Sequence, residues 1–197
     1  MDIVNQVKEQ YARILQVDDW GHLLEVASFH FKNAAKLKKK DVNHPSHKLL
    51  IRNSLKRLHL GIGMELLLKA AFLKNGICVN KLINLQQGQI NAPQHQFDSL
   101  NANQINPKDT FTLGALISKI NIILGDIDAS IVEGMKIAMT FRNKEGHISF
   151  PKHEFDESNY QAIEASVTYI YENLFDLKVH FKISMISGQK GTFKFLK

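Results

Sequence analysis

The stretch 46–74, SHKLLIRNSLKRLHLGIGMELLLKAAFLK, places an apolar residue at every third or fourth position. An α-helix turns once in 3.6 residues, so this spacing gathers the apolar side chains along one face. The sequence therefore predicts a long helix over 46–74 whose apolar face packs against other helices. That face consists of Ile51, Leu55, Leu58, Ile62, Leu66, Ala70 and Leu73.

Two glycines, Gly61 and Gly63, lie inside this predicted helix. A glycine in a helix interior costs about 1 kcal/mol relative to alanine. We expect the two glycines either to allow close packing of a neighbouring helix or to mark a kink.

Apolar periodicity predicts further helices along the chain. Two of them begin at capping boxes, in which a serine side chain and a Glu or Gln three residues later satisfy open backbone groups. These boxes are Ser130 with Glu133 and Ser158 with Gln161. The other predicted helices cover 2–16, 19–39 and 111–124.

Two segments depart from helical periodicity. Residues 84–110 are dominated by Gln, Asn, Gly and Pro, and they predict a long surface loop. Residues 178–197 leave the type of element open. Because 178–183 and 192–195 alternate like strands around a turn at 188–191, a short C-terminal β-hairpin is one interpretation.

These elements predict an all-α fold, a helical bundle of up-and-down helices to which the short C-terminal hairpin would be an addition. We expect a single helical domain over 1–197. Its core would lie at about 45–177, the N-terminal helices at 2–40 would pack on that core, and 178–197 would form an extension.

The composition is that of an ordinary globular protein, with 44% hydrophobic and 22% charged residues. The single cysteine, Cys78, excludes an internal disulfide and a thiolate metal cluster. The sequence shows neither a signal peptide nor an apolar run of about 18 residues. We therefore expect a cytoplasmic protein without a membrane partner.

The formal net charge of the chain is +6, from 25 Lys and Arg against 19 Asp and Glu. A positive protein attracts polyanions, which makes nucleic acid a candidate partner. Lysines crowd the end of the predicted helix 19–39. Lys38, Lys39 and Lys40 could contact RNA, or they could be a solvated helix end.

The best candidate for chemistry is the segment Arg142-Asn143-Lys144-Glu145-Gly146-His147. In an unbroken helix, Arg142 and His147 would lie about 140° apart. If Gly146 ends the helix in a left-handed conformation, the chain reverses there and His147 can return beside Arg142. A guanidinium binds phosphate through paired hydrogen bonds, and an imidazole carries protons near neutral pH. These are the two groups that a metal-independent ribonuclease needs.

Three other interpretations of basic residues stand beside this one. Arg142 could simply stabilise the negative end of a helix dipole. A second match, Arg52 to His59, lies inside the long predicted helix without a break, so we treat it as a decoy. His44 and His47 have the spacing of metal ligands, but no third histidine is near them in sequence.

The segment resembles the Arg-polar-x3-5-His motif of the HEPN family, the helical ribonucleases and RNA-binding modules of toxin–antitoxin and phage-defence systems. Arg142, Asn143 and His147 match the motif, with Asn143 in the polar position. The stretch 61–70, GIGMELLLKA, is similar to a second helix of that family. The resemblance covers about 45–177.

The resemblance implies a homodimer with a composite site that cleaves RNA by attack of the 2′-hydroxyl and needs no metal or cofactor. Arg142, His147 and Asn143 would be the catalytic residues, supported by Glu145 and Gly146. Lys144 would contact RNA together with Lys38, Lys39 and Lys40. Some relatives lack activity, so a non-catalytic RNA- or nucleotide-binding module remains the alternative. An antitoxin or a nucleotidyltransferase could be a partner of either.

A physical argument also favours a dimer. One imidazole cannot easily act as base to the 2′-hydroxyl and as acid to the leaving oxygen in the same step. Two copies of His147 related by a twofold axis would supply both groups.

Overall fold

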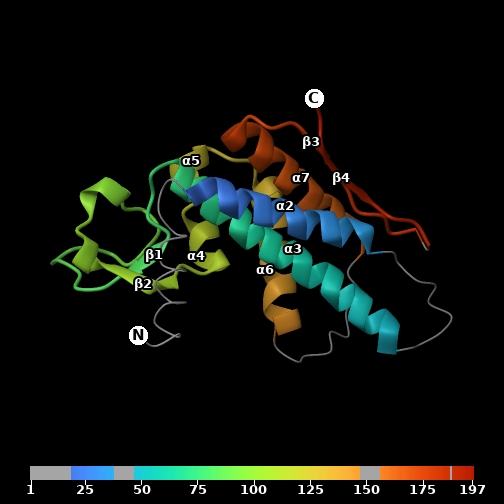
Figure 1. Ribbon diagram of the computed structural model, residues 1–197, viewed down its shortest axis with the longest axis horizontal. Helices are drawn as coiled ribbons and strands as arrows, with labels where there is room; N and C mark the ends of the chain where they lie inside the picture. Colours follow the sequence, from blue (N-terminus) through green and yellow to red (C-terminus); the bar gives the residue numbers. More distant parts are fainter. Residues whose placement is uncertain (1–18, 38–46, 147–155, 187) are drawn as a thin grey trace, which may run out of the picture.

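The computed structural model describes residues 19–37, 47–146, 156–186 and 188–197. The described part is mostly helical and carries two small antiparallel sheets (Figure 1). The long helices are α2 (Trp20–Lys36), α3 (His47–Lys74), α6 (Ala129–Gly146) and α7 (Glu157–Phe175), and the short ones are α4 (Leu113–Ser118) and α5 (Asn121–Leu124). The strands are β1 (Asn80–Leu82), β2 (Ile105–Thr110), β3 (Val179–Lys182) and β4 (Thr192–Phe195).

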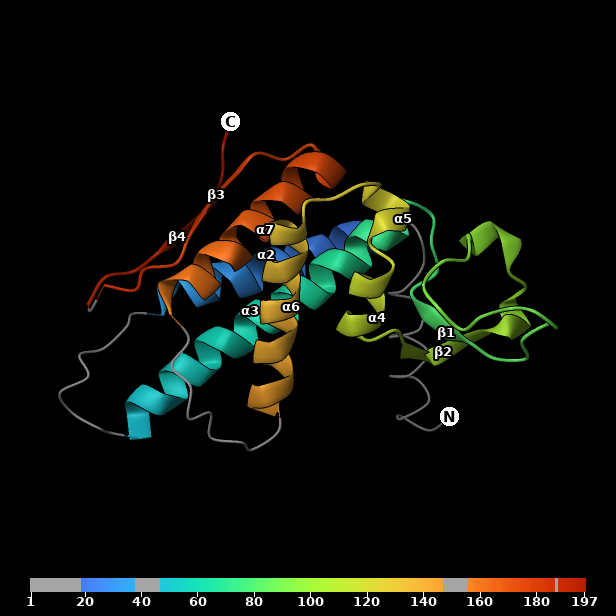
Figure 2. The ribbon, with the colours of Figure 1, turned by 180° about the vertical axis from the view of Figure 1, so that it is seen from behind.

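Helix α3 is the centre of the described fold. It packs against α2 and against α6, and α7 packs on α6 (Figure 1, and from behind in Figure 2). The core between these helices is apolar, but α3 does not bury the whole of the face that the sequence predicted. Leu55 of that face is 42% exposed, whereas Leu60, Met64, Leu67 and Leu68 are fully buried. The largest fully buried side chains of the core include Phe31, Met64, Phe72, Phe141 and Tyr171.

The two glycines of α3 are points of close approach. A Cβ atom added to Gly61 would lie 2.6 Å from the Cβ of Arg142 on α6, and one added to Gly63 would lie 2.8 Å from the ring of Phe31 on α2. Of the two roles considered for these glycines, close packing of a neighbouring helix or a kink, the structure supports close packing. This packing also places α6 and α2 on opposite sides of α3, since two residues rotate a helix by about 200°.

The region 84–110 is more ordered than the predicted loop. Strands β1 and β2 pair at its edges, and 3-10 turns form at Phe97–Ser99 and Ala102–Gln104. The Asn91 amide accepts a hydrogen bond from the Leu82 N–H at 2.9 Å and donates one to the Leu82 carbonyl at 3.0 Å. The loop prediction is thus confirmed for most of 84–104, which is irregular and largely exposed, and is wrong for 105–110, which form β2.

Both predicted capping boxes were wrong by two residues. The Asp128 carboxylate accepts from the Ser130 N–H at the start of α6, and Asp156 forms the capping box of α7 with Asn159. An aspartate carries a full negative charge to the positive end of the helix dipole, which a serine does not. The predicted helix 111–124 is also interrupted, at Lys119 and Ile120, between α4 and α5.

The C-terminal hairpin is confirmed. Strands β3 and β4 pair in register from Val179 opposite Phe195 to Lys182 opposite Thr192. Phe181 and Phe193 point from the hairpin into the core. The predicted helix 2–16 lies outside the described residues. Among the helices that are described, none has the length and the apolarity that crossing a membrane requires.

Candidate active site around Arg142

Arg142 lies in the last turns of α6, on the side that faces α3. Its Nε–H donates to Oε2 of Glu65, which is buried on α3. The Arg142 side chain nevertheless stays 41% exposed. The Glu65 bond occupies one of the five N–H groups of the guanidinium. Arg142 is thus anchored along one edge and keeps donors with which it can meet an anion from solvent.

The Glu65 carboxylate is shared between two cations. Its Oε1 atom accepts from Nζ of Lys69 at 2.8 Å, one helical turn further along α3. The same Nζ donates to the Thr110 hydroxyl at the end of β2, at 2.9 Å. The four residues link α6, α3 and β2, and their two cations outnumber the single carboxylate. This arrangement fixes the guanidinium and leaves an excess positive charge beside it.

The other residues of the motif follow Arg142 along α6. Asn143 is exposed and Lys144 is half-buried. Glu145 and Gly146 are the last two described residues of α6, and Gly146 belongs to the helix. The left-handed Gly146 and the chain reversal that the sequence analysis considered therefore remain a prediction, because the residues that follow Gly146 lie outside the described part of the chain. His147 lies outside the described residues, as do Lys38, Lys39 and Lys40.

Sequence reasoning missed the residues that hold Arg142. Glu65 and Lys69 do carry a signal, because they stand four residues apart in the otherwise apolar stretch 64–73. Charges at that spacing inside a buried helix face are paired far more often than not. Thr110 carries no such signal, since it reaches Lys69 only through the pairing of β1 with β2.

The decoy match has a different environment. Arg52 is exposed on α3, which continues without interruption past His59. Nδ1 of His59 lies 2.8 Å from Nδ1 of His30 on α2. Burial lowers the pKa of both imidazoles, and His59 lowers the pKa of His30 further. His59 is therefore bound to α2 and not to Arg52.

Within 19–37, 47–146, 156–186 and 188–197, His, Cys, Asp and Glu form no group of three or more that could bind a metal ion. Searches for related proteins found no matching family model, no matching curated protein and no matching solved structure.

Proposed function

We propose that this chain is a metal-independent endoribonuclease of the HEPN type, active as a homodimer and acting as a toxin or phage-defence effector. The observation that carries the proposal is the state of Arg142. Its guanidinium is anchored by Glu65 at the end of α6, and the side chain as a whole is still 41% exposed. A phosphate ligand has to remain accessible to solvent, and the exposed part of the Arg142 side chain meets that requirement.

The chemistry would divide between two motifs brought together in the dimer. His147 of one protomer removes the proton from the 2′-hydroxyl, and the 2′-oxygen attacks the adjacent phosphorus. His147 of the other protomer gives a proton to the 5′-oxygen that leaves. Arg142 stabilises the negative charge that builds on the phosphate oxygens, and Asn143 orients the site. The products are a 2′,3′-cyclic phosphate and a free 5′-hydroxyl.

Glu65 is the positioning residue in this proposal. A carboxylate fixed by Lys69 holds the guanidinium in one orientation, so little reorganisation is needed when a phosphate arrives. Lys69 offsets the charge of Glu65, and Arg142 therefore keeps its attraction for an anion.

The alternative function is a non-catalytic RNA- or nucleotide-binding module, alone or with an antitoxin or nucleotidyltransferase partner. The same ion pair favours it in one respect: Glu65 joins α3 to α6, and an arginine that mainly joins two helices need not act on a substrate.

Expression of wild type beside His147→Ala tests the proposal. Wild type should arrest growth and fragment cellular RNA, and His147→Ala should do neither. Light scattering should give the same dimer mass for both proteins. His59→Ala is the matched control, because it removes a histidine from the decoy and should keep the activity. If His59→Ala loses the growth arrest and His147→Ala retains it, the activity belongs to the Arg52–His59 match and not to the Arg142–His147 motif. No RNA fragmentation by any variant would favour the binding module.

A further inference from the structure

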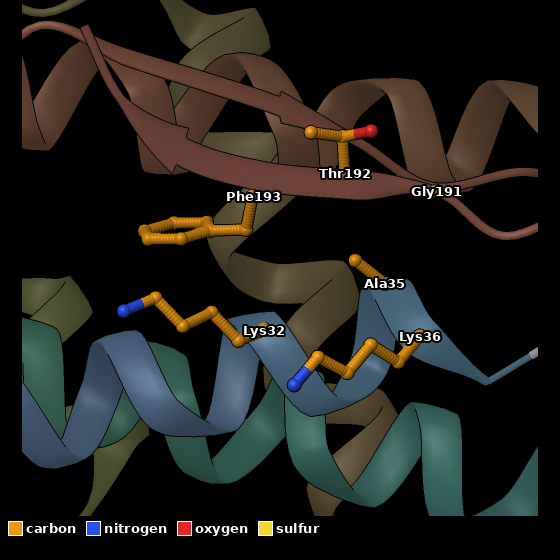
Figure 3. A pocket seen from close by; sticks show the side chains of 6 residues that line it. All are labelled: Lys32, Ala35, Lys36, Gly191, Thr192 and Phe193. Atoms are coloured by element: carbon orange, nitrogen blue, oxygen red, sulfur yellow. The ribbon is translucent and has the colours of Figure 1, made fainter.

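A pocket of about 190 Å³ lies between α2 and the C-terminal hairpin (Figure 3). Figure 3 shows two lysine side chains along the α2 wall and the ring of Phe193 projecting from β4 toward them. The Gly191 N–H donates to the Ala35 carbonyl at 2.8 Å and fixes one edge of the pocket. The residues that line it are Lys32, Ala35, Lys36, Gly191, Thr192 and Phe193.

The α2 wall of this pocket is basic, and the hairpin that forms the other wall is rich in lysine. The segment 178–197 contains five lysines and no Asp or Glu, and the segment 26–37 of α2 contains two lysines and no Asp or Glu. One of the hairpin lysines, Lys182, pairs with Glu164 of α7. Lys32 and Lys36 are exposed and face the pocket. A concave surface lined by cations concentrates anions.

An exposed aromatic ring adjoins the pocket. Phe195 of β4 is 43% exposed, and Nζ of Lys32 lies 5.8 Å from the centre of its ring. Exposed rings beside basic grooves are the surfaces on which unpaired bases stack. The pocket is also smaller than the roughly 300–1,000 Å³ of sites that enclose a whole small molecule. Its size fits a phosphate group of a polymer better than a free nucleotide.

We propose that the α2–β4 pocket binds the phosphate backbone of single-stranded RNA through Lys32 and Lys36, and that a base stacks on Phe195. The choice of RNA among anionic polymers rests on the proposed function. The pocket is separate from Arg142 within one chain, because α2 and α6 lie on opposite sides of α3. It would hold a substrate strand at a distance from the site of cleavage.

The test uses the full chain and a fluorescent 2′-O-methyl oligouridine, which lacks the attacking hydroxyl and cannot be cut by the proposed reaction. Its affinity is measured by anisotropy across a salt series. Each phosphate contact contributes about 0.7 to the slope of log affinity against log salt for a single strand. Lys32→Gln with Lys36→Gln should therefore reduce that slope by about 2 × 0.7, or 1.4. Melting curves confirm that each variant is folded.

Two further variants separate the contributions. Lys108→Gln with Lys136→Gln removes the same charge from exposed positions on β2 and α6 and should leave the slope near that of wild type. Phe195→Leu should weaken binding about fivefold or more at every salt concentration without changing the slope, because stacking does not release counterions.

Equal losses in the two lysine pairs would overturn the proposal, since they would reflect net charge alone. Binding of phosphatidylserine vesicles that depends on Lys32 and Lys36, with RNA binding unchanged, would also overturn it in favour of a membrane surface. The outcome is independent of cleavage. The expected slope change in a protein that never cuts RNA would support the pocket and reject the ribonuclease. Cleavage of RNA without that slope change would support the ribonuclease and reject the pocket.

Discussion

Glu65 is the residue on which the environment of Arg142 depends. It is a buried carboxylate between two cations, and removing one member of a buried charged set leaves the others uncompensated. We predict that Glu65→Gln lowers the free energy of unfolding by about 1–3 kcal/mol. Lys81→Gln is the control, because its ion pair with Asp109 is exposed and pairs of that kind contribute about 0–1 kcal/mol. Chemical denaturation measures both. Equal effects would mean that the Glu65 network contributes no more than a surface pair.

The His30–His59 pair predicts a pH dependence. Burial lowers the pKa of both imidazoles below their usual 6.5, so the folded protein binds fewer protons than the unfolded chain. The contribution of the neutral His30–His59 pair to the free energy of unfolding is therefore complete above about pH 6.5. It is lost as the pH falls through the pKa values of the two imidazoles in the folded protein. A second proton would also break the Nδ1–Nδ1 hydrogen bond and place two cations 2.8 Å apart.

Urea denaturation between pH 7.5 and 5 measures this dependence. Unfolding free energy should fall toward pH 5 in wild type, and the fall should be smaller in His59→Gln. His180→Gln, at an exposed position of β3, is the control and should keep the wild-type slope. An identical slope in His59→Gln and wild type would show that the pair does not set the acid sensitivity.

At the scale of elements, the α3–α6 crossing depends on Gly61. A Cβ there would lie 2.6 Å from the Arg142 Cβ, 2.8 Å from its backbone nitrogen and 2.9 Å from the Ala138 carbonyl oxygen. Backbone atoms cannot rotate away, so Gly61→Ala should force the helices apart and destabilise the fold by about 1–3 kcal/mol. Gly21→Ala on α2 meets nothing within 4 Å and should stabilise by about 0.4–1 kcal/mol. Thermal melting of the two variants should therefore shift in opposite directions, and a stable Gly61→Ala would contradict the crossing.

The elements that the sequence predicted well are those whose own side chains determine them. The apolar periodicity of 46–74 predicted the helix α3 but not which of its faces is buried, and alternation around Gly188 indicated the hairpin. The strand within 84–110 was missed because it forms through bonds to residues distant in sequence, such as the one that the Asn80 amide donates to the Asn106 carbonyl. The site shows the same division. The motif singles out Arg142 as a candidate, whereas Glu65 contacts it only because α3 and α6 cross at Gly61.

At the scale of the whole molecule, α3 separates two basic surfaces. One centres on Arg142 at the α6 crossing, and the other is the α2–β4 pocket with Lys32 and Lys36. The formal charge of +6 favours a polyanionic partner for a molecule with this distribution. In the proposed ribonuclease, the pocket would hold the strand and the dimer would bring two motifs together for the reaction.

The proposed metal-independent cleavage is tested most directly by incubating RNA with the purified chain in excess EDTA and identifying the product ends by mass spectrometry. Wild type should cut RNA in EDTA and leave 2′,3′-cyclic phosphate and 5′-hydroxyl ends. Arg142→Ala should cut about 10²- to 10³-fold more slowly, because it removes the donor that stabilises the transition-state charge. Cleavage that requires Mg²⁺ or Mn²⁺, or that proceeds at the wild-type rate in Arg142→Ala, would contradict the account.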